Sequence, residues 1–190
     1  MKKIKIFLTT SLLAVSAFIM AVPANAEDVL TGDTRLACEA LLCLASGTHP
    51  NECVPSLSRY FSISYKKWND TINGRINFLN LCPTSSQMPG FANALANGAG
   101  RCDVASLNRS RLNILGVGPI SNQLPSYCAA YIGHEYVNLG ELTPTYVGTP
   151  ERDGYWVTAA EYDTALAAYN ARIEAEEAEE AQKRLQSSAY

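Results

Sequence analysis

The sequence predicts a mainly α-helical fold: a small disulfide-stapled helical domain with a short β-hairpin and a C-terminal helix. Three observations lead to this prediction. Apolar residues recur at helical spacing through most of the chain. Proline and glycine separate these stretches at short intervals. Six cysteines follow an export signal, and small exported domains commonly use cysteines as disulfides.

The N-terminus has the features of a cleavable signal peptide. Lys2, Lys3 and Lys5 precede an apolar run at residues 6–20, and Ala24-Asn-Ala26 has the small-x-small pattern of a cleavage site. We therefore expect export to a periplasm. No later segment approaches the roughly 20 apolar residues of a membrane span, so we expect no integral membrane span. The predicted regions are a signal peptide (1–26), the disulfide-stapled helical domain (27–158) and an acidic C-terminal helix or tail (159–190).

The charge of the chain argues against nucleic acid as a direct partner. The formal net charge is −3, and cleavage of the signal would remove three lysines and no acid. A phosphate-binding surface needs concentrated basic residues. The closest candidates are the pairs Lys66-Lys67 and Arg109 with Arg111, which are typical of solvated faces. We expect no direct nucleic-acid binding.

The first half of the mature chain predicts three helices. Asp33 is placed to cap the first, which carries an apolar face and stops at Gly47. Pro55 is placed to open a second helix, and Pro83 ends a third. The apolar residues of the three helices are Ala37, Ala40, Leu41 and Leu44; Leu57, Tyr60, Phe61 and Trp68; and Ile72, Ile76 and Leu79.

The second half is less regular. It predicts short helices at residues 91–96, at 104–115 with Asp103 as the cap, and at 123–132. Tyr146-Val147 and Tyr155-Trp-Val157 flank a turn-rich segment and predict a small hairpin. An isolated two-stranded ribbon is marginal by itself.

The C-terminal helix begins with a capping box, Thr158-Ala-Ala-Glu161. Its apolar stripe is short, and a glutamate-rich run follows from Glu174. Two interpretations remain open. The run is either a solvated helical tail or part of a docking helix. In the second case, the partner contacts are Tyr162, Leu166, Tyr169 and Ile173.

The stretch from Cys38 to Cys53 holds three cysteines and His49, and could be a metal site, a redox centre or a staple. Cys38 and Cys43 lie roughly 140° apart on a helix of about 3.6 residues per turn, so one metal could not easily take both. Cys-x-x-Cys is absent. Disulfides remain, and six cysteines allow about 15 connectivities. We favour Cys43 with Cys53, Cys38 with Cys82, and Cys102 with Cys128.

Catalytic motifs are scarce. His134-Glu135 lacks the second histidine of His-Glu-x-x-His, and no Gly-x-Ser-x-Gly elbow occurs. We therefore expect no enzyme, no catalytic residue, no metal and no cofactor. The alternative is a peptidoglycan-cleaving enzyme with Glu39 as its acid, which would need a carboxyl group in an apolar pocket.

A resemblance to a known family adds a functional expectation. The matching residues are Leu30-Thr-Gly-Asp-Thr-Arg-Leu-Ala-Cys-Glu-Ala-Leu-Leu-Cys-Leu-Ala-Ser-Gly, Glu52-Cys53, Pro55-Ser-Leu57, Tyr60-Phe61 and Phe78-Leu-Asn-Leu-Cys-Pro83. This pattern resembles the TrbM/KikA family of conjugal transfer proteins. The resemblance implies a periplasmic accessory protein of plasmid conjugation, acting through contacts with protein components of a type IV secretion or mating-pair apparatus. It supplies no catalytic residues, and the oligomeric state stays open.

Overall fold

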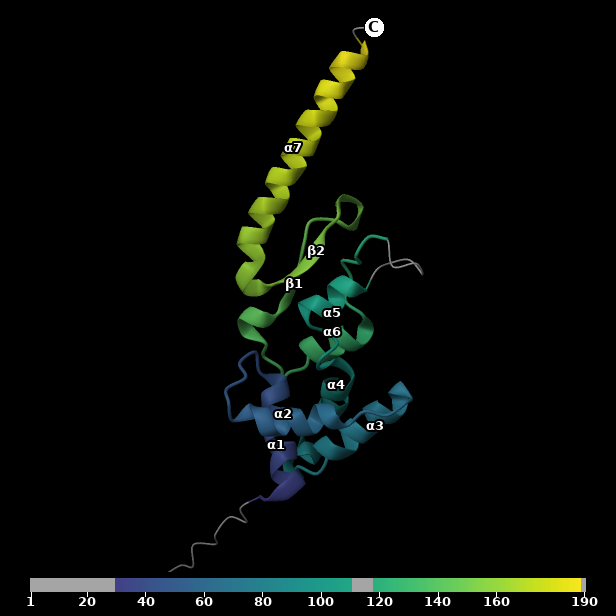
Figure 1. Ribbon diagram of the computed structural model, residues 1–190. Coiled ribbons are helices and arrows are strands. Elements are labelled where there is room, and N and C mark those ends of the chain that lie inside the picture. The colour runs from purple at the N-terminus through teal and green to yellow at the C-terminus, as the bar shows by residue number, and fades with distance from the viewer. Residues whose placement is uncertain (1–29, 111–117, 189–190) are drawn as a thin grey trace, which may run out of the picture.

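The computed structural model describes residues 30–110 and 118–188 (Figure 1). The predicted signal peptide and the end of the helix predicted at 104–115 lie outside these residues. Helices dominate the described chain, with one two-stranded antiparallel sheet, so the predicted fold class is confirmed. The main elements are α1 (Gly32–Ala45), α2 (Cys53–Ser62), α3 (Trp68–Leu79), α4 (Phe91–Gly98), α5 (Val104–Arg109), α6 (Ser126–Ile132), β1 (Pro144–Val147), β2 (Tyr155–Thr158) and α7 (Tyr162–Ser188).

Helix α1 buries the apolar face that its spacing predicts, including Ala37, Ala40 and Leu41. The predicted cap is wrong. Thr31 occupies the N-cap position without a side-chain hydrogen bond, and Asp33 lies within the first turn. The Asp33 carboxylate instead accepts hydrogen bonds from Nε and Nη2 of Arg59 on α2, at 3.1 and 2.7 Å. A contact between two helices has therefore replaced the local cap.

Helix α2 is shorter than the sequence predicts, and Trp68 begins α3 instead of continuing α2. Ile63 has an extended backbone and ends α2. Side chains of α3 hold the connection that follows. Arg75 Nε donates to the carbonyl oxygen of Ile63, and Thr71 Oγ1 accepts a hydrogen bond from the backbone N–H of Tyr65. These bonds satisfy backbone groups that a helix would otherwise have paired.

The main core lies where α1, α2, α3, α4 and α6 meet. Tyr60, Leu79 and Leu95 are completely buried there. Helices α4 and α6 approach closely because Gly98 has no side chain: a Cβ atom at this position would lie 2.3 Å from Cβ of Tyr131. Tyr131 donates from its hydroxyl to the carbonyl oxygen of Leu44, at 2.6 Å, which ties α6 to α1.

The start of each of the short helices α5 and α6 has a local explanation. The Asp103 side chain accepts a hydrogen bond from the backbone N–H of Ser106 at 2.8 Å, so the predicted cap of α5 is confirmed. Helix α6 begins at Ser126, three positions later than predicted. Pro125 explains the difference, because a proline disfavours helical geometry at the residue before it.

The hairpin is present, with Tyr146 opposite Trp156 and Val147 opposite Tyr155. Its side chains alternate between two faces, as strand geometry requires. Tyr146 and Trp156 stack edge to face and pack against the main core. Val147 and Val157 instead contact α7. The marginal ribbon is therefore covered on both faces.

Helix α7 begins behind the capping box, in which Thr158 and Glu161 bond reciprocally as predicted. Its first half packs on the hairpin, and its second half extends away from the other helices (Figure 1). Residues 177–188 are all exposed. No described helix is long and apolar enough to cross a membrane.

Candidate functional site

All six cysteines form disulfides: Cys38–Cys82, Cys43–Cys53 and Cys102–Cys128. This is the pairing that the sequence analysis favoured. Two bridges start on opposite sides of α1, one to α2 and one to the segment behind α3. The cysteine-rich stretch is therefore a pair of staples. Within the described ranges, no group of three or more His, Cys, Asp or Glu side chains is placed to hold a metal ion.

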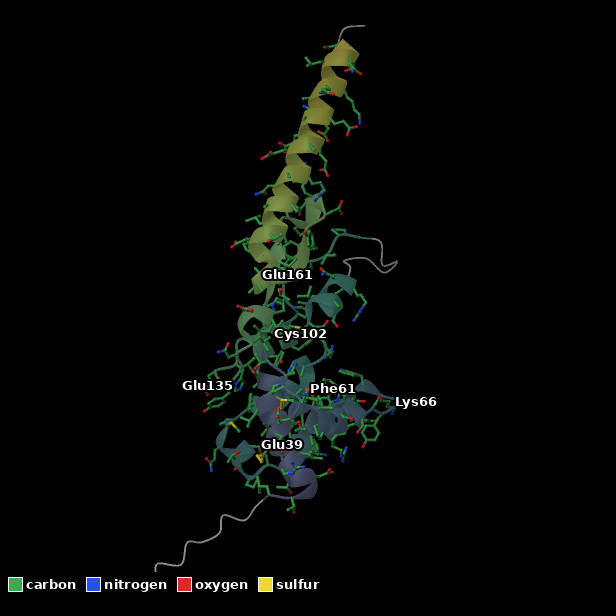
Figure 2. The ribbon with its side chains drawn as sticks, turned by 60° about the vertical axis from the view of Figure 1, so that its left-hand side comes forward. Glu39, Phe61, Lys66, Cys102, Glu135 and Glu161 are labelled. Carbon is green, nitrogen blue, oxygen red and sulfur yellow. A yellow bond between two sulfur atoms is a disulfide. The ribbon has the colours of Figure 1, made fainter. Side chains whose placement is uncertain are left out.

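The residues considered for catalysis lie apart. Glu39 is partly exposed on α1, where its Oε1 accepts a hydrogen bond from Arg35 Nη1 at 2.7 Å. His49 Nε2 lies 3.0 Å from the carbonyl oxygen of Cys43. The His134 ring contacts the rings of Phe91 and Tyr136. Figure 2 shows Glu39, Glu135 and Glu161 in separate parts of the molecule. No two of these three carboxylates form a pair.

The predicted partner-contact stripe of α7 faces inward. Tyr162, Leu166, Tyr169 and Ile173 pack against the hairpin, in a cluster with Val147 and Val157. The Tyr169 hydroxyl also accepts a hydrogen bond from the backbone N–H of Thr149. The chain's own hairpin thus buries Tyr169 and partly covers the other three residues, and a contact of these four residues with a partner stays a prediction.

A different surface has the composition of a contact site. Four aromatic and four basic side chains gather at the end of α2, the start of α3 and the loop behind α4. Two of these side chains, Phe61 and Lys66, are labelled in Figure 2. We call it the aromatic–cation surface, and it comprises Phe61, Tyr65, Lys66, Lys67, Trp68, Arg75, Arg101 and Tyr127.

Arg75 is the buried centre of this surface. Only 7% of the residue is exposed, and its guanidinium carbon lies 4.9 Å from the ring centre of Tyr60, 5.3 Å from that of Phe61 and 5.6 Å from that of Trp68. Arginine keeps its charge in such surroundings. No described carboxylate lies within ion-pair distance of it. Among the described residues, the charge faces three aromatic rings, the carbonyl oxygen of Ile63 and the hydroxyl of Tyr60.

Arg101 repeats this arrangement beside the same indole. Its guanidinium carbon lies 4.8 Å from the ring centre of Trp68 and 3.9 Å from that of Tyr127. Nη1 donates to the carbonyl oxygen of Asn97. Neither Arg101 nor the exposed Lys66 and Lys67 has an ion-pair partner among the described residues. The surface thus holds four cations without a bound carboxylate.

An apolar cavity adjoins the surface at Phe61. Its volume is about 220 Å³, and its walls include Leu44, Leu57 and Tyr131. Gly100 helps to shape it, because its φ of +75° favours glycine and a Cβ atom there would lie 2.9 Å from the Phe61 ring. Exposed aromatic rings, arginines and a neighbouring apolar cavity are the features that dominate binding energy at protein interfaces.

The sequence analysis missed this surface. The segment Tyr60-Phe-Ser-Ile-Ser-Tyr-Lys-Lys-Trp68 places three exposed rings beside two lysines, which is a readable signal. The lysine pair by itself is typical of a solvated face. Arg75 lies two turns after Trp68 on the same helix, α3, whereas Arg101 comes from the loop behind α4, so only the position of Arg101 beside Trp68 has no local signal.

Comparison with known proteins gives one match. A model of the protein family described as TrbM matches residues 29–170. The match includes the stapled helices, the hairpin and the first part of α7. No curated protein and no solved structure matches the chain.

Proposed function

The chain belongs to the TrbM family of conjugal transfer proteins, and we propose that it serves plasmid conjugation as a periplasmic accessory protein. In this role it acts with a type IV secretion or mating-pair apparatus. Its contribution is to bind protein components of that apparatus.

Two features support the periplasmic location. Three disulfides suit an oxidising compartment, because cytosolic thiols are kept reduced. The first 26 residues have the sequence of a cleavable signal. A mass measurement of the mature protein recovered from the periplasm tests this point. A mass that still includes residues 1–26 would contradict it.

The contact site in this proposal is the aromatic–cation surface. One observation carries the assignment: Arg75 and Arg101 lie beside Trp68 without any described carboxylate to pair with. A guanidinium group binds carboxylates through two parallel hydrogen bonds. The surface is therefore suited to an acidic protein segment.

The proposed role is non-catalytic. Glu39, the acid of the alternative enzyme hypothesis, has a partly exposed side chain that pairs with Arg35. A carboxyl group acting as an acid near neutral pH needs an apolar environment instead. Glu39→Gln should leave plasmid transfer unchanged. Loss of transfer by this variant would support the cell-wall enzyme.

A matched pair of variants tests the surface. Trp68→Ala removes the ring that both arginines contact, and Tyr136→Ala removes a ring of similar exposure elsewhere, since the two residues are 44% and 46% exposed. We expect Trp68→Ala to lower the transfer frequency by about tenfold or more, because central aromatic residues dominate interface energy. Tyr136→Ala should transfer like the wild type. Equal transfer by all three proteins would refute the assigned contact site.

Crosslinking identifies the partner directly. A photoreactive residue at Tyr65, which is 58% exposed, lies within the surface, and one at Leu42 is the exposed control. In mating cells, the proposal expects a crosslinked protein at position 65 that is absent at position 42. The same products at both positions would count against a specific contact.

A further inference from the structure

We propose that the acidic second half of α7 in one copy of the protein docks onto the aromatic–cation surface of a second copy. This inference rests on the contact role proposed for that surface and names its partner. We call residues 174–188 the acidic arm. The result is a head-to-tail assembly.

The acidic arm is a helix without a surface to pack on. Beyond Glu176, every described residue of the arm is exposed. Isolated helices of about 12–15 residues are marginal in water. At the start of the arm, Glu176 and Glu177 pair with Arg152 of the hairpin turn. Further along, the arm is supported by ion pairs one turn apart, such as Glu179–Lys183 and Glu180–Arg184. Exposed pairs of this kind are weak and exchange readily for other partners.

The arm cannot reach the aromatic–cation surface of its own chain. Helix α7 is continuous from Tyr162 to Ser188, and 27 residues of helix span about 40 Å. The first half is fixed on the hairpin by Leu166, Tyr169 and Ile173. Figure 1 shows that the helix then leads away from α2 and α3. Any contact between arm and surface must therefore join two molecules.

The two surfaces have opposite charges. The arm carries five glutamates and two basic residues. The aromatic–cation surface offers the exposed Lys66 and Lys67 and the partly exposed Arg101, with Arg75 buried beneath its rings. None of the four has an ion-pair partner in the described chain. Complementary potentials of this kind steer association and fix its register. Residues 174–180 supply carboxylates along the helix, and guanidinium groups bind carboxylates well.

The two surfaces also match in their apolar parts. Leu185 is 71% exposed and is the large apolar side chain of the described arm. The cavity of about 220 Å³ beside Phe61 has room for one aliphatic side chain. Since Phe61 belongs to both the cavity and the aromatic–cation surface, an arm lying on the cations can place Leu185 in the cavity.

Each copy offers one arm and one surface, so the contact is heterologous. Such contacts build either a closed ring or an open chain, and which one forms depends on the rotation between neighbours. Association should rise with protein concentration. It should fall with salt, because exposed charges are screened over about 10 Å at 0.1 M ionic strength.

Charge reversal gives the decisive experiment. The variants Lys66→Glu/Lys67→Glu and Glu179→Lys/Glu180→Lys alter exposed residues on the two surfaces. Sedimentation velocity at low ionic strength should show wild-type self-association, and each variant alone should associate at least about tenfold more weakly. An equimolar mixture of the variants should associate again, because the intact arm of the first meets the intact surface of the second. Circular dichroism checks that both variants fold.

A second pair of variants tests the apolar contact. Leu185→Ala should weaken association roughly tenfold, because burying a leucine side chain is strongly favourable. Leu42 is 74% exposed and lies away from both surfaces, among the walls of another groove. Leu42→Ala should associate like the wild type. Equal behaviour of the two variants would remove Leu185 from the contact and overturn the proposed register.

The outcomes separate this inference from the proposed function. A wild-type protein that stays monomeric, or a variant mixture that does not associate, overturns the second copy as partner. Binding of a fluorescent single-stranded oligonucleotide that Lys66→Glu/Lys67→Glu abolishes, without self-association, would assign the surface to nucleic acid instead. If Trp68→Ala lowers transfer while the wild type is monomeric, only this inference fails. If the mixture associates but every variant transfers normally, only the proposed function fails.

Discussion

The helical body and the C-terminal unit of this protein are stabilised in different ways. The body, α1 to α6, surrounds one large core and contains all three disulfides. The hairpin and α7 share a small cluster around Val147, Val157 and Tyr169, and they contain no cysteine. The body is closed by covalent bonds and burial, while the C-terminal unit depends on a few contacts.

The helices α1 and α7 illustrate the difference. Helix α1 has 14 residues and buries six of them, whereas α7 has 27 residues and buries only Tyr169. Most helical stability in proteins comes from packing an apolar face. The second half of α7 has no such face, so its helical form relies on the propensities of alanine and glutamate and on ion pairs. Local stability should therefore fall steeply along α7.

Hydrogen bonds of the Asn108, Trp156 and Tyr146 side chains join the two units, and the Tyr146 hydroxyl donates to the carbonyl oxygen of Ile120 at 2.7 Å. The Asn108 side chain of α5 donates to the carbonyl oxygen of Trp156 and accepts from its backbone N–H, both at 2.8 Å. The Trp156 indole donates to the carbonyl oxygen of Ser121 at 2.9 Å. Strand β2 is thereby attached to the body through its backbone and through one buried side chain. The second half of α7 is attached only near its start among the described residues, by the exposed ion pairs of Glu176 and Glu177 with Arg152 of the hairpin turn.

Removing the disulfide that closes the longest loop should cause the largest loss of stability. It should leave the acidic arm unchanged. Cys38 and Cys82 are 44 residues apart, and Cys38→Ala/Cys82→Ala should lower the unfolding free energy by about 4 kcal/mol in the chain-entropy account. The Cys43–Cys53 disulfide closes a loop of only 10 residues, so Cys43→Ala/Cys53→Ala should lower the unfolding free energy by about 3 kcal/mol. Chemical denaturation measures both losses. A larger loss from the shorter loop would contradict the entropic explanation.

Alkaline pH should destabilise the body selectively. Burial raises the pKa of Tyr60 and of Tyr131 to about 12, from 10.0 in the unfolded chain. A raised pKa contributes stability that is complete below pH 10 and is lost as the pH rises toward 12. The expected loss is about 1.4 kcal/mol per pH unit for each tyrosine in this window. Denaturation midpoints across the window measure it.

Helix α7 should respond to pH in the acid range, in contrast to the body, and a variant without the two tyrosine hydroxyls is the control. Hydrogen bonding to Arg172 lowers the pKa of Glu176, so its contribution is present above pH 4.5 and is lost as the pH falls below that value. The double variant Tyr60→Phe/Tyr131→Phe should lose the alkaline slope. An unchanged slope in this variant would assign the effect to other groups.

Gly148→Ala should loosen α7 without loosening the body. Gly148 has a φ of +78°, and a Cβ atom there would lie 2.2 Å from the Tyr169 ring. Gly140 has a φ of +53° but open space around it, so Gly140→Ala isolates the backbone strain. We expect a loss of roughly 1–2 kcal/mol for Gly140→Ala and more for Gly148→Ala. Amide hydrogen exchange should show faster exchange in α7 for Gly148→Ala alone. Equal exchange in both variants would mean that the ring relocates freely.

The smallest effect should come from one ion pair of the arm. Glu179→Gln removes the contact to Lys183, while Glu174→Gln changes a residue without an ion pair in the described chain. Only Glu179→Gln should reduce helix content at low salt, by fraying the last turns, and high salt should remove the difference. Circular dichroism of the monomeric protein measures this. Identical spectra would show that propensity alone maintains the arm.

The sequence by itself determined the elements whose signals are local. Apolar spacing located the buried face of α1, Asp103 marked the start of α5, and Thr158 with Glu161 marked the start of the C-terminal helix. The signal-like N-terminal sequence and the diverging directions of Cys38 and Cys43 favoured disulfides over a metal site. Each of these inferences depends on residues within a few turns, where backbone geometry limits the alternatives.

Only the tertiary structure decided which residues far apart in the sequence contact each other. Asp33 binds Arg59, 26 residues away, instead of capping α1. The stripe around Tyr169 packs against the hairpin of its own chain. Arg101, from the loop behind α4, reaches Trp68, which already lies beside Arg75 of its own helix, and this meeting creates the candidate contact surface. Such meetings follow from how helices pack, and packing depends on the whole core and not on any short pattern in the chain.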